Sequence, residues 1–164
     1  MWGDPWTPVL SYLHSYSSAM EAEISDRDAM IAELKRVVEP FLRSTGFKGS
    51  FPHYRKSTPT GIELLTFQFD RHGGAFVAEI ARCPNDGLIT AWGARVPPDK
   101  VKAWDVHPVN RKRIQPVSQS GTDGWFRYDR TPMVDVASAA LRLLSDGDIW
   151  KDVPIGGSNQ PYTE

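Results

Sequence analysis

The sequence predicts an α+β domain in which an antiparallel sheet of about five strands packs against an N-terminal and a C-terminal helix. Three observations lead to this prediction. Apolar residues follow a helical spacing after Ser25, strand-like alternation with turn residues fills the middle, and a second helical stripe follows Thr131. Helix, antiparallel strands and helix in this order are typical of the α+β class. The 164 residues suit one domain with one core.

We expect three parts along the chain. Residues 1–24 form an N-terminal extension, whose Trp2 and Trp6 are apolar enough to pack a short helix on the body. Residues 25–153 form the single α+β domain. Residues 154–164 are polar and rich in glycine and proline, which is typical of a flexible tail.

The first helix begins at Ser25, because its hydroxyl can accept from an unpaired helix amide and Asp28 favours the positive helix end. Pro40 lies inside the apolar pattern and lacks an amide proton. We expect it to kink this helix or to start a second one. Gly46 then ends the helical region.

A first hairpin is predicted from residues 53–57, the turn 58–61 and the strand that starts at residue 62. A four-residue loop joins opposite charges and apolar groups across the strands. The expected pairs are Ser57 with Ile62, Lys56 with Glu63, Arg55 with Leu64, and Tyr54 with Leu65.

A second hairpin is predicted around Gly73-Gly74, which can adopt the positive dihedrals of a tight turn. An even-length loop keeps apolar residues on one face, whereas a slip of one residue would invert every side chain. The expected register pairs Phe67 with Ile80 and Gln68 with Glu79.

The remaining elements are shorter, apart from a third long strand expected over residues 88–96. Two short strands are expected within residues 111–117 and 124–129. Thr131 and Pro132 are the expected N-cap and first-turn proline of the final helix.

Composition excludes several classes of protein. A net charge of -1 makes a nucleic-acid partner unexpected, and one cysteine excludes an internal disulfide framework. No apolar stretch is long enough for a membrane helix, and the first residues lack a signal-peptide pattern. The expected location is therefore the cytoplasm.

No motif assigns a catalytic residue, a metal site or a cofactor. The four histidines lack the spacing with which a helix presents two zinc ligands. Cys83 lacks the local signature of a nucleophile and is expected to be a structural thiol.

Two clusters are candidates for binding. Arg55, Gln68 and Glu79 share the mixed face of the predicted sheet, where they can hold a polar ligand or form a structural network, and we favour the network. Arg111, Lys112 and Arg113 can meet an acidic partner or a phosphate, although a solvated edge strand is favoured over both.

Six tryptophans are many for this length. Most should be anchors of the core or of its edges. An exposed tryptophan would indicate a protein partner, and Trp104 is the candidate that we single out.

Four segments occur in the order seen in the bacterial domain-of-unknown-function 4304 family, which the chain resembles over roughly residues 27–152. They are "VVEPFLRSTGFKG", "HYRKS", "LLTFQFDRHGGAFVAEIA" and "GTDGWFRYD". The chain departs from the family pattern at Asp70, where a small polar residue is common, and at Phe126, where tryptophan is common. The resemblance implies a fold more than an activity. By analogy, small bacterial domains of this kind are often partners of toxin systems.

The expected function is therefore a non-enzymatic protein-binding domain. Its partner would be another protein. The most specific expectation is a secreted toxin domain, which this chain neutralises as a cytoplasmic immunity protein. The alternative is a small-ligand-binding domain or an enzyme that uses the mixed face of the sheet.

Overall fold

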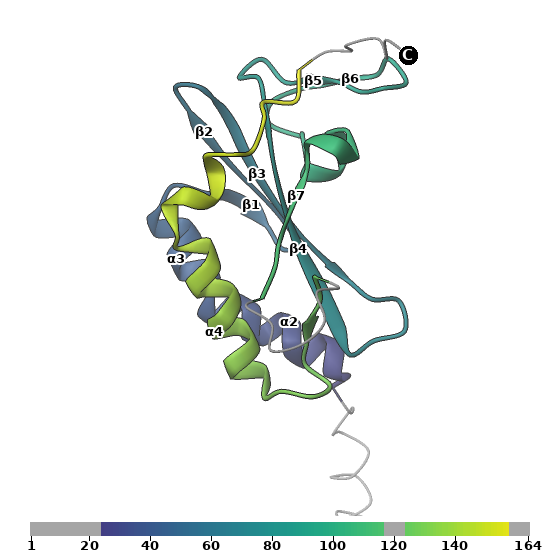
Figure 1. Ribbon diagram of the computed structural model, residues 1–164, viewed down its shortest axis with the longest axis vertical. Coiled ribbons are helices and arrows are strands. Elements are labelled where there is room, and N and C mark those ends of the chain that lie inside the picture. Colours follow the sequence, from purple (N-terminus) through teal and green to yellow (C-terminus); the bar gives the residue numbers. More distant parts are fainter. Residues whose placement is uncertain (1–23, 117–123, 158–164) are drawn as a thin grey trace, which may run out of the picture.

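An antiparallel sheet forms the middle of the protein (Figure 1). The computed structural model describes residues 24–116 and 124–157. The strand order is β1-β2-β3-β4-β7, and β8 also pairs with β4. The strands are β1 (Lys48–Ser50), β2 (His53–Thr58), β3 (Gly61–Phe69), β4 (Ala75–Cys83), β7 (Lys112–Ile114) and β8 (Phe126–Arg127). The predicted α+β class, with about five strands and helices from both ends of the chain, is confirmed.

Three helices cover one face of the sheet. They are α2 (Asp26–Val37), α3 (Glu39–Ser44) and α4 (Met133–Leu144), and they lie on the same side of the strands in Figure 1. Their apolar residues pack on the face that carries Tyr54, Leu65, Phe67, Phe76, Ala78 and Ile80, which we call the helix face. The larger of the two apolar clusters lies here.

The helices begin and end mostly as the sequence predicts. Ser25 caps α2 by accepting from the backbone N–H of Asp28 at 3.2 Å. Pro40 separates α2 from α3, as expected for a residue without an amide proton. Gly46 follows α3 with φ of 96°, a conformation that favours glycine. At α4 the N-cap position is occupied by Pro132, not by Thr131.

The register of the first hairpin is confirmed. Lys56 lies opposite Glu63, and Tyr54 lies opposite Leu65. The turn is closed by Thr58, whose Oγ1 donates to the carbonyl of Gly61 at 2.7 Å. Because both a charge pair and an apolar pair had to match, the sequence could specify this pairing uniquely.

The register of the second hairpin differs from the prediction by two residues. Phe67 lies opposite Ala78, not Ile80, and Glu79 lies opposite Thr66, not Gln68. The amide of Asp70 donates to the carbonyl of Ala75 at 2.9 Å, so residues 71–74 form a longer turn than the predicted one. The even-length loop, and with it the face of each side chain, is as predicted.

The predicted long strand at residues 88–96 is wrong. This stretch folds back as a hairpin of two short strands, β5 (Leu88–Ile89) and β6 (Arg95–Val96), which form a sheet of their own. The side chain of Thr90 accepts from the amide of Ala94 at 2.9 Å and stabilises the turn. The polar and glycine positions at 90 and 93 break the strand pattern.

Residues 84–111, which we call the connector, join β4 to β7 and cover the second face of the sheet. They contain the β5–β6 hairpin and two short 3-10 helices, η1 (Ala103–Asp105) and η2 (Pro108–Asn110). Buried connector residues pack on β3 and β4 in the second apolar cluster, made of Ile62, Leu64, Ala81, Cys83, Leu88, Val101, Ala103 and Val106. We call this side of the sheet the connector face.

After α4 the chain forms η3 (Gly147–Trp150) and returns to the sheet. A flexible tail was predicted from residue 154, but its first residues are bound to β4. Ile155 forms a parallel β-bridge with Arg82, and the amide of Gly156 donates to the carbonyl of Arg82 at 2.8 Å. The predicted N-terminal extension, apart from Ile24, and residues 158–164 lie outside the described residues.

Candidate functional site

A row of polar side chains crosses the connector face. The strand registers align one residue from each of five strands: Ser50, His53, Thr66, Glu79 and Arg113. Because cross-strand partners point to the same side, all five belong to the face opposite the helices. Thr66 and Glu79 are the buried members of this row.

Glu79 is at the centre of the row and pairs with two arginines. Its side chain accepts from Nε of Arg113 at 3.3 Å, and Nη1 of Arg111 lies 3.6 Å from its second oxygen. This second oxygen is buried and has no hydrogen bond, since 3.6 Å exceeds hydrogen-bond length. Arg111 therefore stabilises it through charge, and the cluster carries a net positive charge.

Arg111 also attaches the connector to the sheet. Its Nε donates to the carbonyl of Val106 at 2.7 Å, and its Nη2 donates to the carbonyl of Trp104 at 2.6 Å. The same guanidinium thus contacts Glu79 on β4 and two backbone oxygens of the connector. These contacts give Arg111 a structural role.

His53 and Trp104 extend the cluster toward the connector. Nδ1 of His53 is 3.0 Å from the hydroxyl of Thr66, and its ring meets the Trp104 ring edge to face at 4.9 Å. Burial lowers the pKa of His53, the positive charges of Lys102 and Arg55 act in the same direction, and the negative charge of Asp105 opposes them. The neutral imidazole is therefore the favoured form in the folded protein.

A second tryptophan lies at the other side of the row. The guanidinium of Arg113 sits 5.7 Å from the centre of the Trp125 ring. Such a cation–π contact restrains both groups. Trp104 thus contacts the row at His53, and Trp125 contacts it at Arg113.

The other predicted site residues do not join Glu79. Gln68 is exposed and lies opposite Val77, so the expected pair of Gln68 and Glu79 does not form. Arg55 is on the connector face, but it donates to the carbonyl of Asp99. Lys112 faces the other way, and its ammonium is 3.4 Å from the carbonyl of Ile149.

The structure therefore brings together four of the seven residues singled out: Glu79, Arg111, Arg113 and Trp104. The sequence reasoning missed His53 and Trp125 as members of this cluster. A signal for His53 was available, since the confirmed register of the first hairpin places it opposite Thr66. No comparable pattern indicated Trp125.

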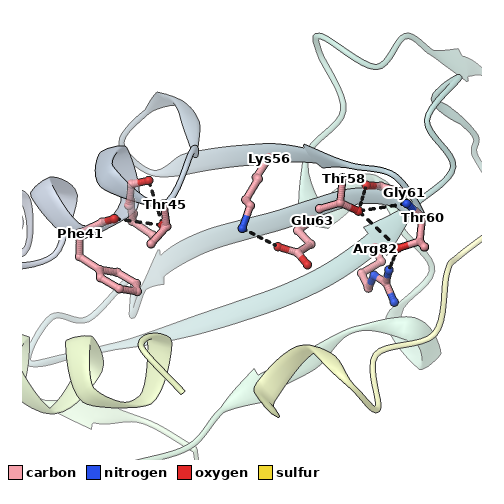
Figure 2. A network of polar contacts seen from close by, with 9 residues as sticks. Phe41, Thr45, Lys56, Thr58, Thr60, Gly61, Glu63 and Arg82 are labelled. Atoms are coloured by element: carbon pink, nitrogen blue, oxygen red, sulfur yellow. Dashed lines mark hydrogen bonds and ion pairs between the residues drawn. The ribbon is translucent and has the colours of Figure 1, made fainter. Parts of the chain in front are cut away.

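A separate polar cluster occupies the far end of the first hairpin (Figure 2). Lys56 and Glu63 pair at 3.8 Å on the helix face, and Nη2 of Arg82 donates to the hydroxyl of Thr60 at 2.7 Å. In Figure 2 these side chains reach from one strand to the next or close the turn at Thr58. They stabilise the hairpin, and we assign them no binding role.

Cys83 lies beneath the connector and is fully buried. Burial, followed by the charges of Asp86 and Asp105, raises the pKa of its thiol to about 11. A thiol of this kind is protonated at neutral pH and is a poor nucleophile. Among the described residues, no group of three or more histidine, cysteine, aspartate or glutamate side chains could hold a metal ion.

A small pocket of about 160 Å³ lies at the β5–β6 hairpin. Its lining includes Asp86, Leu88, Ile89 and Arg95. It is formed by the connector itself, away from the Glu79 cluster.

Comparison with known proteins identifies one relationship. The model of the family described as "Domain of unknown function (DUF4304)" matches residues 38–148. The chain belongs to the DUF4304 family. No curated protein and no solved structure matches it. The matched region contains β2, β3, β4 and the whole connector, so the Glu79 cluster lies within the family domain.

No helix in the described part of the chain is long and apolar enough to cross a membrane.

Proposed function

We propose that this DUF4304 domain is a non-enzymatic protein-binding domain, and more specifically a cytoplasmic immunity protein that neutralises a secreted bacterial toxin by direct binding. One observation carries the proposal. Trp92, at the tip of the β5–β6 hairpin, is 74% exposed, and Trp104 and Val109 on the same connector are also exposed. Large apolar side chains that gather on one surface segment are typical of a protein interface, and tryptophan is enriched among hot-spot residues.

The chemistry of the connector face supports a binding role over a catalytic one. Glu79 is held between two arginines, and Cys83 has a raised pKa under the connector. A general base or nucleophile needs a pKa matched to its task and access to a substrate. Both groups are buried, so neither has the access that a substrate requires.

A small-ligand-binding domain is the second candidate. The observation in its favour is the buried oxygen of Glu79 that lacks a hydrogen bond and lies 3.6 Å from Nη1 of Arg111. A ligand with a hydroxyl or amine group would satisfy it. A Glu79→Gln variant that loses binding of such a ligand while folding normally would favour this candidate.

The proposal is tested by expressing the protein in cells together with the toxin encoded by the neighbouring gene. We expect the wild-type chain to protect the cells and to co-purify with the toxin. Trp92→Ala should weaken protection, because it removes an exposed anchor without touching the core. Val134→Ala on α4 removes another exposed apolar side chain, so it is the matched control and should protect fully.

A second pair of variants separates binding from catalysis. If the domain acts by binding, Cys83→Ala and His72→Ala, both outside the exposed surface of the connector, should protect as well as the wild type. Loss of protection by either variant in a folded protein would instead favour catalytic detoxification. Absence of a toxic neighbouring gene product would remove the immunity role.

A further inference from the structure

The connector face carries an excess of positive charge that the rest of the chain does not share. Seven cations lie on the connector or on the connector face of β1, β2 and β7, against four carboxylates on the connector and β4. The cations are Lys48, Arg55, Arg95, Lys100, Lys102, Arg111 and Arg113, and the carboxylates are Asp86, Asp99, Asp105 and Glu79. The whole chain has a net charge of -1, so the remainder is acidic.

The carboxylates of this surface that have described contacts are engaged inward. Glu79 pairs with Arg111 and Arg113, and the carboxylate of Asp105 accepts from the backbone N–H of Lys102 at 2.8 Å. By contrast, no carboxylate of the described residues forms an ion pair with Arg95, Lys100 or Lys102, all of which are exposed. Asp86 and Asp99 are also exposed and form no described ion pair, so the positive charge presented to solvent is the excess of the cations over these two carboxylates.

The helix side differs in this respect. Arg36 pairs with Glu33 on α2, and Arg43 pairs with Glu39 on α3 at 2.8 Å. Arg36 and Arg43 are neutralised in this way, whereas Lys35 on α2 and Arg142 on α4 are exposed and form no described ion pair. The connector side is therefore distinguished by its excess of cations over carboxylates, not by the lack of pairing.

Exposed apolar groups alternate with these cations. Ile89 lies opposite Arg95 in the β5–β6 hairpin, and Trp104 follows Lys102 by two residues. Trp92 is at the hairpin tip between the two short strands. A surface of this kind combines apolar contact area with oriented positive charge, which sets the register of a charged partner and speeds its encounter.

We infer that the connector is the docking surface and that its partner is a protein presenting an acidic surface with apolar side chains among the carboxylates. This inference rests on the proposed function and names the chemistry of the partner. The apolar groups around Trp92 supply contact area, and Arg95 and Lys100 meet the partner's carboxylates. Raising the salt concentration therefore weakens the complex.

The test is a selection that needs no knowledge of the toxin. Random peptides displayed on phage are selected on the immobilised wild-type chain and counter-selected on an Arg95→Glu, Lys100→Glu variant. We expect the enriched peptides to be acidic and to carry aliphatic or aromatic residues. Neutral or basic peptides, or no enrichment over the counter-selected variant, would overturn the inference.

Binding of an enriched acidic peptide is then measured by fluorescence anisotropy. The Arg95→Glu, Lys100→Glu variant should bind about tenfold more weakly or worse, as should the wild type when sodium chloride rises from about 50 to about 300 mM. The matched control is Arg71→Glu, Arg142→Glu, which makes the same charge change at exposed residues outside the connector. It should bind within about twofold of the wild type. Equal loss in both variants would overturn the inference.

Two further measurements test whether the connector surface binds DNA or a second copy of the chain instead. Tighter binding of double-stranded DNA than of the peptide, or self-association in sedimentation that Trp92→Ser abolishes, would overturn an acidic protein partner. The two proposals fail separately. Cells protected by a chain that selects no acidic peptides would leave the immunity function standing, whereas acidic peptides without protection would leave the docking surface standing.

Discussion

The helix face and the connector face are two sides of the same strands, yet they are held by different interactions. On the helix face, Phe67 and Phe76 pack against further rings and against three helices. On the connector face, an apolar half under the connector adjoins a polar row around Glu79. The first face is a closed apolar core, whereas the second joins a small core to a charged surface.

This difference places most of the stabilising interactions on the helix face. Rings and aliphatic side chains on the helix face bury apolar area, which is the main stabilising contribution in a domain of this size. The polar row contributes less per residue, because each ion pair loses hydration as it forms. The connector face can therefore carry exposed and charged groups at modest cost to the fold.

The largest expected effect is on the helix face. Phe67 is buried, stacks with Phe51 at 5.5 Å and meets Phe76 edge to face at 6.0 Å between ring centres. Phe67→Ala should lower the free energy of unfolding by about 3–5 kcal/mol, because it leaves a cavity among rings that cannot close fully. Denaturant melts measure this change.

The control for that variant is His72→Ala in the exposed turn. It should change the free energy of unfolding by about 0.5 kcal/mol or less. Equal midpoints for the two variants would contradict the assignment of Phe67 to the core.

The second expected effect tests how well the connector shields Cys83 from solvent. Cys83 is fully buried and the pKa of its thiol is raised to about 11, mainly by burial. At pH 8 its reaction with iodoacetamide should be about 100-fold slower or more in the folded protein than in denaturant, since few thiols are ionised. Rapid labelling without unfolding would mean that the connector opens readily.

The third effect compares one carboxylate on each face. Glu79→Gln should cost about 1–2 kcal/mol, because two arginines lose their partner and one of them is mostly buried. Glu63→Gln breaks a single 3.8 Å pair with Lys56 and should cost below about 1 kcal/mol. A larger loss for Glu63→Gln would reverse the comparison.

The smallest expected effect depends on pH. Burial lowers the pKa of His53 below its unfolded value, so the unfolded state binds more protons between the two values. The contribution of His53 is therefore destabilising once pH falls below about 6.5, and it grows until pH passes the folded pKa. Above this window it is absent.

Urea melts from pH 8 to pH 5 measure this effect. The loss of stability should be smaller in His53→Gln than in the wild type, whereas His72→Gln should follow the wild type. Identical curves for His53→Gln and the wild type would contradict the role of burial at His53.

The sequence predicted the fold class because strong periodic patterns specify it. The first hairpin was predicted in register since Lys56–Glu63 and Tyr54–Leu65 constrain it twice. The second was placed on the correct faces but two residues out of register. An alternation with period two is unchanged by a shift of two residues, so the pattern could not fix the longer turn at 71–74.

The candidate site was predicted in part for the same reason. Glu79 was expected on the mixed face, and it lies there. Its cross-strand partner was predicted from the wrong register, so Gln68 was named where the structure has Thr66. The contact of Arg111 with Glu79 depends on the path of the connector, whose residues 88–96 carry a strand-like composition but fold back at Thr90.

The attachment points of the connector have a consequence for engineering. It leaves the sheet at the end of β4 and re-enters on β7, which pairs directly with β4 through Ile80 and Lys112. A loop whose ends lie on adjacent strands costs little extra closure entropy as its length changes. A designer can therefore lengthen or replace the exposed β5–β6 hairpin, provided that buried connector residues such as Val101 and Ala103 stay in place to cover the sheet.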